Sequence, residues 1–143
     1  MIESLEYCSV YKEGHVTTVT IEQPEIMNAL HRPAHEELTR VLDAFSVDSD
    51  AWVAVITGSG RRAFCPRSDL KYMAETGDGY TQGKGFAGLT GRRDLTKPVN
   101  GVTVGGGGLH RLTGQIPLKK EIHLLLTGRI CMREEPLALG LVN

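Results

Sequence analysis

Two short segments of the sequence contain backbone groups that could bind an anion. Residues 63–70, AFCPRSDL, read as a turn from a buried strand into a helix, and Gly105–Gly108 directly follow the run VNGVTV. Free N–H groups at a helix N-terminus lie at the positive end of the helix dipole, and glycine amides can be approached closely by a ligand oxygen. Two such donors converging on one oxygen would form an oxyanion hole, in which one donor is worth about 2.7–4 kcal/mol. Taken singly, the two segments are explained equally well by a capped helix and a flexible linker.

Other motifs have simpler explanations. Residues 83–88, GKGFAG, match G-x-G-x-x-G, but a dinucleotide site needs a strand before this motif and a helix after it, so we expect a flexible loop. His31 and His35 stand four residues apart, yet Arg32 occupies the position at which zinc proteases of this spacing need glutamate. We therefore expect solvated histidines at a helix start and no metal site. No nucleophile is paired with a histidine by spacing or context.

The first half of the chain predicts elements that would position these segments. Residues 4–12 and 15–21 read as an antiparallel hairpin, because HVTTVTI alternates with β-branched residues. Apolar residues at three- and four-residue spacing predict an amphipathic helix over 33–45. WVAVITG, residues 52–58, is a short apolar run typical of a strand covered on both sides. Strand, helix and strand in this order predict a parallel βαβ crossover.

The second half shows weaker patterns. Ser68 and Asp69 are expected to cap a short helix that runs through Met73. Residues 75–92 lack periodicity and read as a mobile surface loop. Further elements are expected in three places, namely a strand at 99–104, an amphipathic helix at 118–126 and a last short helix at 133–139 that Pro136 limits.

The composition is that of one soluble globular domain. The 143 residues carry a net charge of −1 with a pI near 6.5, so we expect neither nucleic acid nor an anionic membrane as a partner. Three distant cysteines favour a reducing compartment, and we expect no secretory leader and no membrane span. Glycine is the unusual component, because 11 of the 17 fall between Gly77 and Gly108. Such a cluster indicates either a disordered loop or backbone brought close to a ligand.

Four segments in order resemble the enoyl-CoA hydratase/isomerase (crotonase) family. They are VTIEQPEIMNAL, VLDAFSVDSDAWVAVITGSGRRAFCPRSDLKYM, KPVNGVTVGGGG and LLLTGRICMREEPLALGLVN. The match runs almost end to end, with unmatched sequence mainly in residues 75–92. The resemblance implies an α/β fold of the ClpP/crotonase type, a spiral of ββα units, present here as one incomplete domain over residues 1–143.

The resemblance also implies a site. In the family, the thioester carbonyl of an acyl-CoA lies between two backbone amides, and the matching positions here are Ser68 and Gly106, with Gly107 an alternative because the run is four glycines long. Contacts to coenzyme A are implied for two segments, with the residues Met27, Ala29, Ser68, Asp69, Leu70 and Lys71. Coenzyme A would enter as part of the substrate, with no permanently bound cofactor. A homo-oligomer, a trimer or a dimer of trimers, and a cytoplasmic location are implied as well.

Departures from the family pattern concern the catalytic groups. Pro66-Arg67 replaces Ala-Gly before the capped turn, and Leu109 stands where hydratases place one catalytic glutamate. The segment of the second glutamate has no counterpart, and a few strand residues are missing at Val99-Asn100. We therefore expect that internal segments and the C-terminal helices of the family are missing from this chain. Sheet faces left uncovered in this way would cause aggregation or dependence on a partner.

Two functions follow from this combination. The first is an enoyl-CoA hydratase/isomerase-like enzyme that stabilises a thioester enolate with the amides of Ser68 and Gly106. The alternative is a non-catalytic remnant that binds acyl-CoA or contributes to an oligomer, because hydration needs a carboxylate pair that cannot be named here. A binder of nucleotide phosphates is disfavoured, since no glycine-rich turn has the required strand and helix around it.

Overall fold

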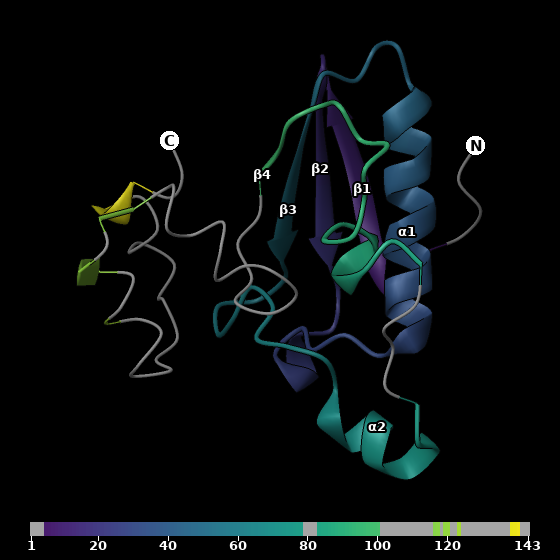
Figure 1. Cartoon of the computed structure of the whole chain (residues 1–143), viewed down its shortest axis with the longest axis vertical. Helices are drawn as coiled ribbons and strands as arrows, with labels where there is room; N and C mark the ends of the chain where they lie inside the picture. The colour runs from purple at the N-terminus through teal and green to yellow at the C-terminus, as the bar shows by residue number, and fades with distance from the viewer. Residues whose placement is uncertain are drawn as a thin grey trace.

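A four-stranded sheet with one long helix against it forms the core of the computed structural model, which describes residues 5–78, 83–100, 116–117, 119–120, 123 and 138–140. The strand order is β1-β2-β3-β4 (Figure 1). The strands are β1 (Cys8–Glu13), β2 (Val16–Ile21), β3 (Val53–Gly58) and β4 (Val99–Asn100). The helices are η1 (Pro24–Ile26), α1 (Arg32–Val47), α2 (Leu70–Thr76) and η2 (Phe86–Gly88). None of the described helices is both long and apolar enough to cross a bilayer.

The first half of the chain folds as its sequence predicts. β1 and β2 are antiparallel, and β2 and β3 are parallel with α1 as the crossover between them. The hairpin, the helix and the strand predicted over 52–58 are thus confirmed. The prediction that this strand is covered on both sides is wrong in the described part of the chain. On one side of β3, Val53 and Val55 are half-buried and Thr57 is exposed. Successive strand residues face opposite sides of a sheet, and α1 covers only one of them.

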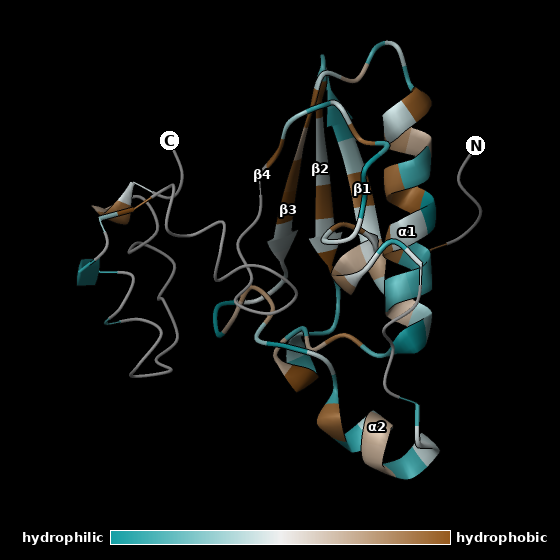
Figure 2. Cartoon of the chain, in the orientation of Figure 1, coloured by the Kyte–Doolittle hydropathy of each residue, from teal (hydrophilic) through white to brown (hydrophobic). Residues whose placement is uncertain are grey.

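α1 is held against the sheet by one apolar face. His31 caps its N-terminus, where the imidazole Nδ1 accepts a hydrogen bond from the N–H of Ala34 at 3.2 Å. At the other end, Lys97 donates to the carbonyl of Phe45 at 2.9 Å, which places a cation at the negative end of the helix dipole. Brown and teal segments alternate along the helix in Figure 2. The buried apolar residues of α1 are Ala34, Leu38, Val41, Leu42 and Phe45, and their main partners in the sheet are Val19, Ile21, Ala54 and Ile56.

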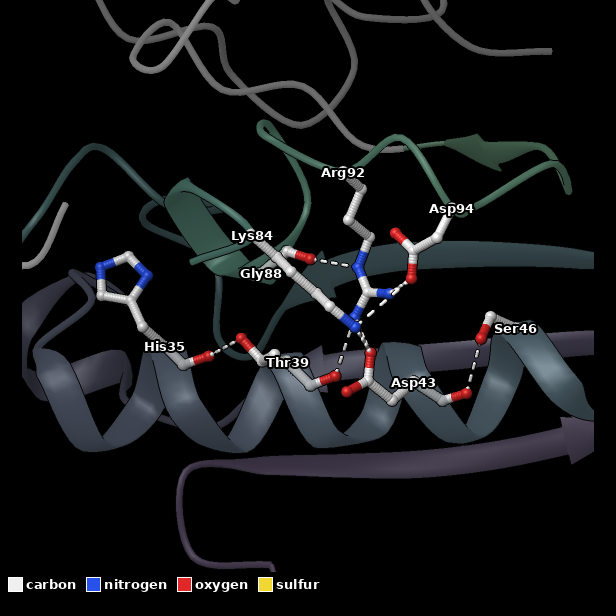
Figure 3. Close-up of polar contacts among 8 residues, drawn as sticks. All are labelled: His35, Thr39, Asp43, Ser46, Lys84, Gly88, Arg92 and Asp94. Carbon is white, nitrogen blue, oxygen red and sulfur yellow. Dashed lines mark hydrogen bonds and ion pairs between the residues drawn. The ribbon is translucent and has the colours of Figure 1, made fainter. Parts of the chain in front are cut away.

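Residues 83–94 pack against α1. The 3-10 turn η2 buries Ala87 and Gly88. Arg92, whose side chain is 1% exposed, donates to the carbonyl of Thr39 at 3.0 Å and forms an ion pair with Asp43 (Figure 3). Residues 75 and 76 belong to α2, and the prediction of a surface loop over 75–92 is also wrong for residues 86–88. It is wrong because the interactions that bury this turn come from a helix about 50 residues earlier in the chain.

Several predicted elements lie outside the described residues. They include the strand beyond residue 100 and the glycine run at 105–108. Most of the helices predicted over 118–126 and 133–139 lie outside as well.

Glu37 connects α1 to the segment that enters β1. Its side chain is buried and its two carboxylate oxygens accept hydrogen bonds from the backbone N–H groups of Glu6, Tyr7 and Cys8, each at 2.8 Å. Burial acts to raise the pKa of Glu37, but these hydrogen bonds outweigh it and hold the pKa below its ordinary value. The charged carboxylate therefore stabilises the folded chain.

We predict that Glu37→Gln lowers the free energy of unfolding by about 1.5–3 kcal/mol, because hydrogen bonds to a charged acceptor are lost. The control is Glu36→Gln, whose exposed pair with Arg32 contributes at most about 1 kcal/mol. Urea denaturation at several pH values measures both. Since the folded-state pKa of Glu37 is depressed, its stabilisation is present above the unfolded value of about 4.3 and is lost as the pH falls through the folded-state value. An equal stability of Glu37→Gln and Glu36→Gln at pH 7 would contradict this role.

We also predict that Gly88→Ala is more destabilising than Gly83→Ala. Both glycines are left-handed, with φ of +64° and +68°, so an alanine at either position would introduce a similar backbone strain. A Cβ at Gly88 would lie 2.6 Å from the Cα of Thr39, whereas nothing lies within 4 Å at Gly83. The expected difference in unfolding free energy is about 1–3 kcal/mol, the usual cost of overpacking. Equal losses would show that residues 86–88 do not pack on α1 in solution.

Candidate functional site

The turn that follows β3 lies against the segment that follows β2. The N–H of Leu30 donates to the carbonyl of Arg67 at 3.0 Å, and the N–H of Asp69 donates to the carbonyl of Leu30 at 2.9 Å. These two hydrogen bonds form an isolated parallel bridge between Leu30 and Ser68. Leu30 and residues 67–69, which are far apart in the sequence, therefore lie side by side.

The N–H of Ser68 is left free by this pairing. In a parallel bridge, Leu30 bonds to the residues on either side of Ser68, so the Ser68 amide points away from Leu30. Within the described ranges, this N–H donates no hydrogen bond. The next residue, Asp69, caps α2, and its Oδ1 accepts from the N–H groups of Lys71 at 2.9 Å and Tyr72 at 3.1 Å. The predicted cap is thus the side chain of Asp69 and not that of Ser68.

The structure brings together most of the residues predicted for the site. Ala29 is buried at the bridge, Met27 and Ser68 are half-buried, and Leu70 and Lys71 are exposed. Leu70 is an apolar side chain that is 51% exposed at the start of α2. Gly106, the second predicted amide, lies outside the described residues.

Positive charge gathers on the chain around this turn. Arg61, Arg62 and Arg67 are exposed, and none of them forms an ion pair with a residue that the structure describes. Lys71 is also exposed and lies 3.9 Å from Glu75, a distance at which a solvated pair contributes little. These cations suit a ligand that carries several negative charges.

Cys65 lies in this turn but is not suited to nucleophilic chemistry. It is 8% exposed, and burial raises the pKa of its thiol to about 12, against the opposing effect of a hydrogen bond from the backbone of Arg67. The thiolate is the reactive form of cysteine, and it is not populated at neutral pH in this environment. Cys65 is therefore a core residue.

The two histidines have separate structural roles. His31 caps α1, whereas His35 is fully buried and its Nδ1 accepts a hydrogen bond from the N–H of Ala87 at 2.9 Å. The prediction of solvated histidines is therefore wrong for His35, because the apolar face of the helix includes its position. Burial, with a smaller effect from His31, lowers the pKa of His35 to about 4, so the ring is neutral and able to accept. In the described part of the chain, no three acidic, histidine or cysteine side chains are grouped as metal ligands.

Asn28 is the polar residue of the site that sequence reasoning missed. It is 0% exposed and has a left-handed backbone with φ of 62°. Its side chain accepts from the N–H of Gln23 at 3.0 Å and donates to the carbonyls of Ser59 and Ala63 at 3.0 and 2.8 Å. The one local signal is that asparagine tolerates a left-handed conformation better than other residues with a side chain. Its partners around residues 59–63 could not be read from the sequence.

The chain is similar to known proteins both in sequence and in structure. A sequence profile described as enoyl-CoA hydratase/isomerase matches residues 11–113. The carnitinyl-CoA dehydratase of Proteus mirabilis is 31% identical over 168 aligned positions, which cover 91% of this chain and 64% of that protein. The carnitinyl-CoA dehydratase of Citrobacter koseri is also 31% identical, over 181 positions that cover 100% of this chain and 68% of the relative. The crystal structure of an enoyl-CoA hydratase from Mycobacterium marinum superimposes with a TM-score of 0.77 at 25% identity, and the match covers 96% of this chain and 68% of that one.

The lengths of these matches bear on the segments predicted to be missing. This chain spans about two thirds of the length of the relatives, 64% for the Proteus mirabilis protein. The Citrobacter koseri alignment has 181 positions for a chain of 143 residues, so about 38 positions of the relative have no counterpart here. This difference confirms that internal segments of the relatives are missing from this chain.

With a profile match over more than half of its residues and a crotonase-type arrangement of sheet and helix, the chain belongs to the enoyl-CoA hydratase/isomerase family.

Proposed function

We propose that this chain binds acyl-CoA thioesters and acts as an enzyme of the hydratase or isomerase type, using the N–H groups of Ser68 and Gly106 as an oxyanion hole. The observation that carries the proposal is the bridge between Leu30 and Ser68, which leaves the Ser68 N–H unpaired among described residues in the turn between β3 and α2. A preorganised donor of this kind stabilises the negative charge that develops on the thioester oxygen when an enolate forms.

The surroundings of Ser68 support a coenzyme A ligand. Met27 and Ala29, for which the family implies contacts to coenzyme A, belong to the segment that ends at Leu30, the residue that forms this bridge. The exposed arginines of residues 61–67 supply positive charge for the phosphates of coenzyme A. Coenzyme A would act as part of the substrate, with no other cofactor. We further propose a cytoplasmic homo-oligomer, a trimer as in the family.

A non-catalytic acyl-CoA-binding protein is the second candidate function. Hydration needs one carboxylate to take a proton from water and an acid to protonate the α-carbon of the substrate. Leu109 stands where the family resemblance implies one of these glutamates, and about 38 positions of the Citrobacter koseri relative have no counterpart in this chain. Binding of an enoyl-CoA without turnover would favour this second function.

We predict that Ser68→Pro weakens the binding of an acyl-CoA thioester or slows its turnover, whereas Ser68→Ala does neither. Proline removes the N–H and alanine keeps it, so the pair separates the backbone donor from the hydroxyl group. For an active chain, Ser68→Pro should lower kcat about 10²–10³-fold with crotonyl-CoA, the usual cost of losing an oxyanion-hole donor. Ser68→Ala should remain close to the unsubstituted protein.

The same pair of variants tests a chain that only binds. Titration calorimetry with crotonyl-CoA and with free coenzyme A reports the thioester contact separately, because free coenzyme A has no carbonyl for the Ser68 amide. Ser68→Pro should lower the affinity for crotonyl-CoA and leave the affinity for free coenzyme A unchanged. Circular dichroism verifies that the variant is folded. Absence of any binding by the unsubstituted protein would exclude both functions.

We predict that the double variant Arg61→Gln/Arg62→Gln binds coenzyme A more weakly by up to about 30-fold, since each of two exposed charge pairs contributes up to about 1 kcal/mol. The loss should be largest at low ionic strength, because salt screens exposed charges. Arg93→Gln, an exposed arginine in the loop that packs on α1, is the matched control and should bind normally. An equal effect of Arg93→Gln would assign the change to net charge alone.

A further inference from the structure

Asn28 connects three parts of the chain through one buried side chain. Its Oδ1 binds the backbone at Gln23, and its Nδ2 binds the carbonyls of Ser59 and Ala63. The first partner begins the segment that follows β2, and the other two lie in the loop that follows β3. A side chain that is 0% exposed and makes three hydrogen bonds has a single favourable placement.

The Asn28 contacts and the Leu30–Ser68 bridge attach the same two segments at two places. Asn28 binds Ala63 at 2.8 Å, and two residues later Leu30 binds Arg67 and Asp69 at 3.0 and 2.9 Å. Two attachments fix both the separation and the relative direction of two segments, whereas one would act as a hinge. Ser68 lies within the doubly attached part of the turn.

The backbone around Asn28 is shaped for this arrangement. Met27 and Asn28 are both left-handed, with φ of 59° and 62°, a conformation that is unfavourable for a residue such as Met27. Gly58 makes room for the amide, since a Cβ at that position would lie 2.6 Å from the Nδ2 of Asn28. Backbone strain at such a place persists only where the surrounding contacts compensate for it, and the three hydrogen bonds of Asn28 are those contacts.

We propose that Asn28 is the positioning residue of the site: its side-chain amide sets the distance between residues 27–30 and the Ser68 turn, and thereby the position of the Ser68 N–H. Asn28 acts through the backbone and does not touch the ligand. Its link to acyl-CoA binding rests on the function proposed above, but its effect on the turn does not.

The test uses Asn28→Asp and Asn28→Gly in the full chain, with Val41→Ala as control. The aspartate keeps an acceptor for Gln23 and loses both donors, while glycine keeps the left-handed backbone and loses all three bonds. Val41 is 1% exposed on α1, so Val41→Ala lowers overall stability without touching the turn. Hydrogen exchange measured amide by amide reports the bridge through the N–H groups of Leu30 and Asp69.

Both Asn28 variants should raise exchange at Leu30 and Asp69 by about tenfold or more, the change expected from one lost buried hydrogen bond. The amides that pair β1 with β2 should exchange as in the unsubstituted protein. Unchanged protection at Leu30 and Asp69, or an increase spread evenly over the sheet as expected for Val41→Ala, would overturn the proposal. If one variant does not fold, the exchange of the Leu30 and Asp69 amides in the other variant decides the test.

The affinity for crotonyl-CoA completes the test. Asn28→Asp should lower the affinity for crotonyl-CoA about tenfold. Val41→Ala should bind crotonyl-CoA with the affinity of the unsubstituted protein at a temperature where both are folded. Faster exchange at the bridge with unchanged affinity would overturn the link between Asn28 and the ligand. A chain that binds no acyl-CoA at all would remove the proposed function, and the exchange of Leu30 and Asp69 would still decide whether Asn28 positions the turn.

Discussion

The parallel pairing of β2 with β3 is the constraint on which the candidate site depends. The two strands pair in register from Val16 with Val53 to Ile21 with Gly58, and α1 makes the crossover between them. Both strands therefore end at the same edge of the sheet, and the segments that leave them run side by side. Ligands of α/β proteins commonly bind at the carboxyl ends of parallel strands. The bridge between Leu30 and Ser68 forms at this edge.

Buried polar side chains then fix each irregular segment to this framework. Glu37 binds the backbone before β1, His35 binds the backbone of η2, and Asn28 binds the loop after β3. All three side chains are at most 3% exposed, and an unpaired polar group at such a place would cost about 1–3 kcal/mol. Hydrogen bonds are directional, so these contacts select one placement of each segment, which apolar packing alone does not do.

Predictions from the sequence were most successful where the pattern is local. The apolar spacing of α1, the alternation in HVTTVTI and the aspartate before α2 each describe a contact within a few residues, and all of them correspond to observed elements. Predictions failed at residues 86–88 and at His35, which are buried by contacts with each other's segments. A glycine-rich stretch without periodicity is indistinguishable from a mobile loop until its partner on α1 is known.

The sequence by itself determined the order of strand, helix and strand, the Asp69 cap and the family resemblance, because each depends on residue type and spacing along the chain. The tertiary structure decided that Leu30 lies against the Ser68 turn, that the amide of Asn28 joins the same two segments, and that the Ser68 N–H points away from Leu30. These contacts span about 35 to 40 residues, so they depend on the crossover through α1, which brings both strand ends to one edge of the sheet.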